Sequence, residues 1–152
     1  MPAALSGGYH ASVRVLGIDL GRRRIGFAVS DPTGVLARPL EVVEAAGPGQ
    51  LDRVVAVVTR LSAEADGLDA IVVGLPRRLD GTPTDLTDSV ASFAEALVRR
   101  VAQPVHLQDE RLSSVEAESR LALGDRDWRS RKRKLDAAAA AVILQDYLDV
   151  RR

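Results

Sequence analysis

Three acidic side chains stand where the sequence pattern places the ends of strands or the start of a helix. Asp19 follows the apolar run 13–18, Glu110 follows a predicted strand at 104–108, and Asp136 precedes five alanines at 137–141. A carboxylate beside buried apolar segments is costly unless a partner or a metal ion compensates its charge. If the three side chains converge, their oxygens would suit Mg²⁺ or Mn²⁺.

Each acid also has a purely structural explanation. Asp19 is also explained as a turn residue that caps a hairpin. Glu110, next to Asp109, is also explained as part of a solvated loop before a helix N-cap at Ser113 or Ser114. Asp136 resembles an acid that the helix dipole favours near a helix N-terminus. The catalytic interpretation is that all three converge, hold two Mg²⁺ or Mn²⁺ ions and support hydrolysis of a phosphodiester bond.

Hydrophobic periodicity predicts the elements that must position these acids. Strands are expected at 13–19, 25–30, 35–43, 69–74 and 104–108, and helices at 50–66, 85–101, 113–123 and 135–150. Turn residues occupy 31–34, and 124–134 is expected to be a polar connection. A three-strand meander followed by alternating helices and strands predicts an α/β fold with a mixed five-stranded sheet, in the order βββαβαβα, flanked by helices.

Length and composition indicate one aliphatic domain. The chain has 152 residues, and we expect a flexible tail at 1–12 and a single domain at 13–150. Apolar residues make up 46% and aromatic residues 3%, which disfavours disorder and requires a core of aliphatic side chains. The absence of cysteine excludes disulfides and thiolate metal sites. Because signal-peptide and membrane-spanning patterns are lacking, we expect a cytoplasmic protein.

Basic residues gather beside the three acids, although the formal net charge is zero. Around converged acids they would form a surface for a phosphate backbone. Each run by itself also fits a solvated loop, and Arg24 also fits a structural ion pair. The predicted nucleic-acid-binding residues are Arg22, Arg23, Arg24, Arg77, Arg78, Arg111, Arg126, Arg129, Arg131, Lys132, Arg133 and Lys134.

Three further features have weaker functional interpretations. Trp128 lies among arginines, where it could stack on an unpaired base or anchor a loop. His10 and His106 are isolated, and we do not expect them to bind metal. The segment 77–84 contains glycine and proline and could be a mobile flap over a substrate.

Four segments of this chain together resemble the motifs of the YqgF/RuvX family. They are GIDLG at 17–21 with RIG at 24–26, VGLP at 73–76 with DGT at 80–82, DERLSS at 109–114, and DAAAA at 136–140 with ILQ at 143–145. Their order and spacing match from about residue 13 to 150. The serines at 113 and 114 stand where the family often has threonine.

The resemblance implies a ribonuclease-H-like fold and a cytoplasmic bacterial nuclease, with Asp19, Glu110 and Asp136 at the family's acidic positions. Family members are described as nucleases that mature the 5′ end of the 16S ribosomal RNA precursor, and as Holliday-junction resolvases of DNA recombination and repair. Structured RNA and branched DNA therefore both remain candidate partners. Because a resolvase makes two symmetric cuts, it would act as a homodimer.

Two other classes of function compete with a nuclease. A non-catalytic nucleic-acid-binding protein with the same fold would bind without metal-dependent cleavage, and the intact acids count against it. A phosphate-loop enzyme of the actin or sugar-kinase type would need a second domain, for which 152 residues leave no room. The chain also lacks a Gly-x-x-x-x-Gly-Lys-Ser/Thr motif.

Overall fold

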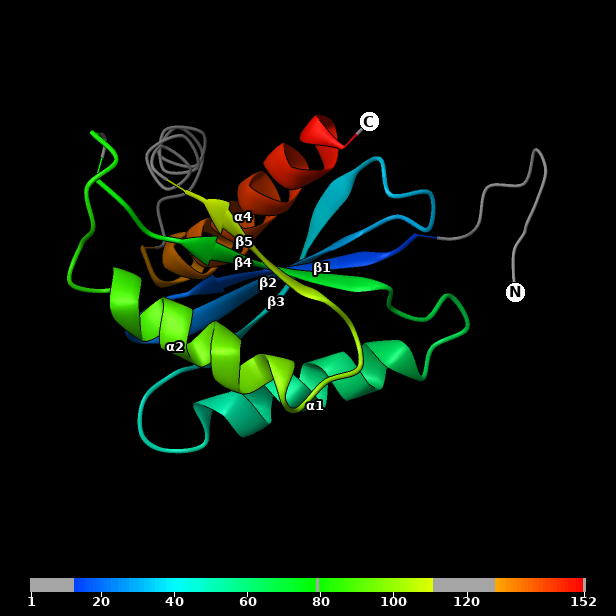
Figure 1. The fold of residues 1–152 in the computed structure, drawn as a ribbon, viewed down its shortest axis with the longest axis horizontal. Helices are drawn as coiled ribbons and strands as arrows, with labels where there is room; N and C mark the ends of the chain where they lie inside the picture. Colours follow the sequence, from blue (N-terminus) through cyan, green and yellow to red (C-terminus); the bar gives the residue numbers. More distant parts are fainter. Residues whose placement is uncertain (1–12, 79, 111–127, 152) are drawn as a thin grey trace.

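A mixed sheet forms the centre of the computed structural model, which describes residues 13–78, 80–110 and 128–151 (Figure 1). Within the last range, side chains are described from Ala137 onward. The sheet order is β3-β2-β1-β4-β5. The strands are β1 (Val15–Leu20), β2 (Arg24–Ser30), β3 (Ala37–Glu44), β4 (Ala70–Leu75) and β5 (Val105–Asp109).

The strand directions bring three strand ends to one edge of the sheet. β1 pairs with β2, and β2 with β3, in antiparallel fashion, as expected for a meander. β1 pairs with β4, and β4 with β5, in parallel. The carboxyl ends of β1, β4 and β5 therefore lie side by side, which is where open α/β sheets bind their ligands. This topology confirms the predicted mixed five-stranded sheet.

Helices cover both faces of the sheet, as Figure 1 shows. α1 (Gln50–Ser62) and α2 (Thr87–Val98) pack on one face, and α4 (Trp128–Val150) packs on the other. Leu16 and Ile18 of β1 belong to the core beneath α1 and α2, whereas Val15 belongs to the core beneath α4. No helix in the described ranges has the length and apolar character needed to cross a membrane.

The packing of α4 depends on small residues in both partners. A Cβ atom at Gly17 would lie 2.8 Å from Leu144 Cβ and 3.1 Å from the Ala140 carbonyl oxygen. Ala140 is fully buried at this contact surface, in one cluster with Val15 of β1 and Val72 of β4. The alanines therefore let the helix approach the sheet closely, as the sequence predicted.

The start of α4 differs from the prediction. The helix begins at Trp128, so the expected polar connection at 124–134 is wrong for 128–134. These residues include arginines and lysines, which are good helix formers, and contain neither glycine nor proline. Their polarity indicates exposure to solvent, which a helix on the surface provides as well as a loop. The predicted helix at 113–123 and the tail at 1–12 lie outside the described residues.

The third strand begins later than predicted because a side chain extends the preceding turn. Asp31 Oδ1 accepts hydrogen bonds from the backbone N–H groups of Val35 (2.9 Å) and Leu36 (2.8 Å). These donors are consequently used in the turn, and β3 starts at Ala37. Gly34, at φ 73°, takes the left-handed conformation of the turn that the sequence predicted at 31–34.

Candidate active site

Two of the three predicted acids lie together at the edge formed by the parallel strand ends. Along β1, alternate side chains point to opposite faces, so Asp19 lies on the same face as Gly17, toward α4. Glu110 directly follows β5, and its backbone N–H donates to the Leu75 carbonyl oxygen (3.2 Å). A hydrogen bond links the carboxyl groups of Asp19 and Glu110.

Gly74 makes the approach of these acids possible. β4 lies between β1 and β5, with Ile18 opposite Val73 and Gly74 opposite Gln108. A Cβ atom at Gly74 would lie 2.8 Å from Glu110 Oε2, so the Glu110 carboxyl group occupies the space of the missing side chain. This role of Gly74 is not among the predictions from the sequence. The signal was a glycine inside a buried strand, which often marks a close approach.

The environment of Glu110 opposes its ionisation. The pKa of the Glu110 carboxyl is raised from 4.5 to about 8, mainly by burial and further by the negative charge of Asp19, the hydrogen bond with Asp19 and the charge of Asp109. Glu110 Oε2 is buried and has no hydrogen-bond partner among the described residues. A buried, partnerless carboxylate oxygen beside a second carboxyl group is suited to a cation.

The described side chains fit a divalent cation but do not complete a site. Asp19 and Glu110 supply hard oxygen donors, which Mg²⁺ and Mn²⁺ prefer. Groups of three or more His, Asp or Glu side chains able to hold a metal ion are absent from the described part of the chain. The side chain of Asp136, the third predicted acid, is outside that part.

The backbone of α4 nevertheless shows which end of the helix approaches the acids. His106, which is opposite Val72 in the sheet, contacts the Tyr147 ring with 5.6 Å between centroids. Two residues further along β4, the Gly74 position is covered by Ile143. The helix thus runs opposite to β4, and its turns before Ile143 lead toward the strand ends. Asp136 is two turns before Ile143 and is positioned on the same helix face.

The longer helix removes one explanation for Asp136. An acid is favoured by the helix dipole only within about the first turn. Because α4 begins at Trp128, Asp136 is more than two turns inside the helix. The prediction that Asp136 lies near the helix start is therefore wrong, and the helix dipole does not account for this acid.

The three arginines of the β1–β2 hairpin have different surroundings. Arg24 is on the Asp19 face of the sheet, with its Nε 3.8 Å from Glu44 Oε2, which agrees with the ion pair considered for it. Arg22 pairs with Asp85, in the connection before α2, and Arg23 is exposed. Gly21 makes the hairpin turn tight, because a Cβ atom there would lie 2.6 Å from the Arg24 carbonyl oxygen.

Arg77 and Arg78 follow β4 and take part in a compact connection. Arg77 forms an isolated bridge with Pro83, and the Arg78 guanidinium donates to the Pro83 carbonyl oxygen (3.0 Å). The flap function of 77–84 stays a prediction. Of the remaining predicted cations, Arg111 and Arg126 lie outside the described residues. The helix α4 contains the others, whose side chains are not described: Arg129, Arg131, Lys132, Arg133 and Lys134.

The fold is similar to those of solved Holliday junction resolvases. The fowlpox virus Holliday junction resolvase aligns with a TM-score of 0.57 and 10% identity, covering 92% of this chain and 100% of that one. T. thermophilus RuvC in complex with a Holliday junction substrate aligns with a TM-score of 0.54 and 20% identity, covering 91% and 95%. This likeness concerns the fold alone and confirms the predicted ribonuclease-H-like class.

Sequence comparisons give the family within this class. The family model described as "RuvX: Holliday junction resolvase" matches residues 13–150. A relative from Thermobifida fusca is 42% identical over 145 residues, covering 90% of this chain and 87% of the relative. One from Mycolicibacterium paratuberculosis is 45% identical over 142 residues, covering 91% and 81%. Both carry the name "Putative pre-16S rRNA nuclease". The chain belongs to the RuvX family, as its motifs predicted.

Proposed function

We propose that this protein is a divalent-metal-dependent nuclease that hydrolyses phosphodiester bonds in structured nucleic acid, with Asp19, Glu110 and Asp136 as its metal-binding carboxylates. The single observation that carries this proposal is the contact between the carboxyl groups of Asp19 and Glu110 over Gly74. An acid pair of this kind costs stability unless it serves a ligand, and its oxygens suit Mg²⁺ or Mn²⁺.

The residues of the chain have distinct roles in this proposal. Asp19 and Glu110 hold the cation from the ends of β1 and β5, and Asp136 approaches from α4. Gly74 leaves room for the Glu110 carboxyl group. When bound, the metal ions lower the pKa of water and stabilise the charge that develops on the phosphodiester. The predicted arginines and lysines orient the phosphate backbone.

We favour the precursor of 16S ribosomal RNA as the substrate, with cleavage at its 5′ end in the cytoplasm. Support comes from relatives at 42% and 45% identity that are named for this activity and align over most of their length. The family description instead names Holliday junction resolution. That function requires a homodimer with two sites, so branched DNA is the second candidate substrate.

A cleavage assay tests the proposal. Labelled precursor-type RNA and four-way DNA junctions are incubated with wild-type protein in Mg²⁺, Mn²⁺ or EDTA. We expect metal-dependent cleavage, and Asp19→Asn should lower its rate at least about a hundredfold, because removing a metal ligand costs several kcal/mol of transition-state stabilisation. The control Asp66→Asn changes an exposed acid after α1 and should cleave like the wild type.

The competing function predicts a different result in the same assay. A non-catalytic nucleic-acid-binding protein would bind RNA or DNA and leave both intact in every metal. Cleavage that persists in Asp19→Asn would contradict the proposed site, whereas binding without cleavage by folded wild-type protein would favour the non-catalytic alternative.

A further inference from the structure

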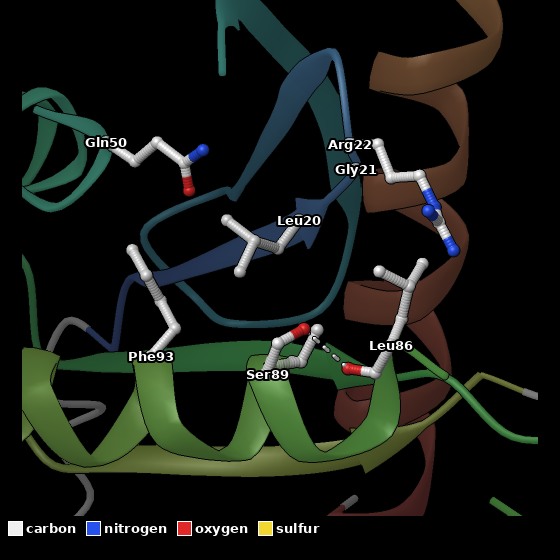
Figure 2. A pocket seen from close by; sticks show the side chains of 8 residues that line it. Leu20, Gly21, Arg22, Gln50, Leu86, Ser89 and Phe93 are labelled. Atoms are coloured by element: carbon white, nitrogen blue, oxygen red, sulfur yellow. Dashed lines mark hydrogen bonds between the residues drawn. The ribbon is translucent and has the colours of Figure 1, made fainter. Parts of the chain in front are cut away.

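A pocket lies next to the candidate active site, at the carboxyl end of β1 and on the opposite face of the sheet. It has a volume of about 260 Å³ and is bounded by β1, the β1–β2 turn, the start of α1 and the first turns of α2 (Figure 2). Leu20 forms part of its wall and directly follows Asp19. Because neighbouring strand residues point to opposite faces, Asp19 and Leu20 face the two sides of one strand end.

The walls of the pocket combine apolar surfaces with polar groups. Leu20, Leu86 and Phe93 supply apolar surface, as Figure 2 shows. Gln50 lies at one end, where its amide nitrogen donates to the Ala45 carbonyl oxygen and its amide oxygen keeps its capacity to accept, and Ser89 lies on α2. The Ser89 hydroxyl donates to the Leu86 carbonyl oxygen (3.1 Å) and keeps its capacity to accept. Apolar walls with a few polar groups at fixed positions are typical of pockets for small organic ligands.

The positively charged side chain of Arg22 lies at the opening of the pocket. The Arg22 side chain is 63% exposed and pairs with Asp85, which comes just before α2. This pair holds the guanidinium beside the pocket while most of it stays open to solvent. A guanidinium in such a position can bind a phosphate group outside the pocket or stack on a base within it.

We propose that this pocket binds one unpaired nucleobase of the substrate strand, with Arg22 contacting the adjoining phosphate. The inference rests on the proposed function, because the scissile bond would lie at Asp19, one residue away along β1. The tight turn at Gly21 carries no side chain that would separate the two sites. Drug-sized ligands occupy pockets of roughly 300–1,000 Å³, so this smaller pocket suits a single base whose sugar and phosphate remain outside.

The proposal explains how the protein would prefer an unpaired segment. In a duplex the faces of each base are covered by stacking, and only the edges are accessible. A base in a single-stranded segment can leave the stack, enter an apolar pocket and use its edges for hydrogen bonds. The substrate strand would therefore be anchored by a base on one face of the sheet and cleaved on the other.

The test is an abasic scan of a short single-stranded RNA, with binding measured by fluorescence anisotropy in EDTA so that no cleavage occurs. One base is removed at a time along the strand. For the wild type we expect one position, or two adjacent positions, at which removal weakens binding about tenfold or more, because a base in contact contributes roughly 1–3 kcal/mol. Equal, small effects at every position would overturn the proposal.

Matched variants on α2 link the effect to the pocket. Ser89→Phe fills the pocket from an exposed helix position, and Ser92→Phe adds the same side chain at an exposed position outside it. We expect Ser89→Phe to bind the intact RNA about tenfold more weakly and to lose its sensitivity to the abasic position. Ser92→Phe should behave like the wild type. If Ser89→Phe instead binds and responds like the wild type, the pocket is not the base site.

The same RNA in Mg²⁺ and Mn²⁺ separates this proposal from the proposed function. A position-dependent loss of binding without any cleavage would support the pocket and contradict the nuclease. Cleavage with no sensitive position would support the nuclease and contradict the pocket. The scan is repeated with DNA of the same sequence to show whether the pocket accepts RNA alone or both nucleic acids. A sensitive position in RNA alone, or in both RNA and DNA, supports the base site.

Discussion

Glu110 differs from the other acids with a shifted pKa in how its charge is compensated. Most other acids with a shifted pKa are exposed and accept hydrogen bonds, as Asp31 does from Thr33, Val35 and Leu36. Those bonds hold the pKa of Asp31 at about 2. Glu110 instead faces burial and a second acid, which raise its pKa to about 8. The two pKa values are thus shifted in opposite directions. The lowered pKa belongs to Asp31, which stabilises a turn, and the raised pKa belongs to Glu110, whose environment suits a ligand.

The raised pKa predicts a pH-dependent stability in EDTA. Between about pH 4.5 and about pH 8 the unfolded chain has released the Glu110 proton while the folded chain retains it. Because the unfolded state then binds fewer protons, the free energy of unfolding falls as pH rises through this interval and levels off above it. Urea denaturation across this range measures the slope, and Glu110→Gln should make it shallower.

Asp31 does not complicate this measurement. Its pKa is lowered from 3.8 to about 2, so the stability that it contributes is present above about pH 4 and is lost as pH falls toward 2. An unchanged slope in Glu110→Gln between pH 4.5 and 8 would show that Glu110 is not held protonated in the folded protein.

Gly74→Ala should lower the cleavage rate strongly and the free energy of unfolding only slightly. The new Cβ atom would lie 2.5 Å from Ile143 Cδ1 and 2.8 Å from Glu110 Oε2. Both atoms are ends of side chains that can move, so we expect a loss of about 1 kcal/mol in the free energy of unfolding. Moving the Glu110 carboxyl group, however, should lower the cleavage rate at least about tenfold, measured on folded protein.

A second substitution separates the two contacts of Gly74. Ile143→Val removes the Cδ1 atom that meets the new methyl group and leaves Glu110 unchanged. Gly74→Ala combined with Ile143→Val should therefore regain part of the packing without regaining cleavage. Recovery of both in the double variant would mean that Gly74 serves helix packing alone.

At the scale of elements, the docking of α4 decides where Asp136 is placed. Gly17 lies directly beneath this helix, against Leu144 Cβ and the Ala140 carbonyl oxygen. Both atoms are attached to, or part of, the helix backbone and cannot move without displacing it. The distance between α4 and the sheet is therefore fixed by the absence of a side chain at Gly17.

Gly17→Ala should consequently cost more stability than Gly74→Ala. We expect the free energy of unfolding to fall by about 3 kcal/mol, at the upper end of typical overpacking effects. Urea denaturation of both variants under the same conditions gives the comparison. If Gly17→Ala proved the less destabilising of the two, the close packing of α4 on β1 would not be a principal constraint on the fold.

The elements show what a single sequence could predict. Alternating and helical periodicity predicted β1 through β5, α1 and α2, because these patterns reflect direct burial against a core. The start of α4 was missed, since an exposed helix of arginines and lysines has no apolar pattern. The pairing of Asp19 with Glu110 was expected from the strand ends. The role of Gly74 was not expected from the sequence, because it depends on the register between β4 and β5.

At the scale of the whole molecule, the candidate site combines distant parts of the chain. Asp19 comes from β1, Glu110 follows β5 and Asp136 belongs to α4, so the proposed site of three acids would require the complete sheet and its covering helix. The same edge carries the β1–β2 hairpin arginines and the proposed base pocket on the other face. The proposed metal site and the proposed base pocket would thus share one set of strand ends.

Binding of Mn²⁺ tests this account most directly. Calorimetric titration at pH 8.5, above the raised pKa of Glu110, compares the wild type with Asp19→Asn, Glu110→Gln and Asp136→Asn, using Asp66→Asn as the control. We predict that each of the three substitutions weakens Mn²⁺ binding by at least about tenfold, with the control unchanged. Equal Mn²⁺ affinity in all five proteins would contradict a metal site formed by these three acids.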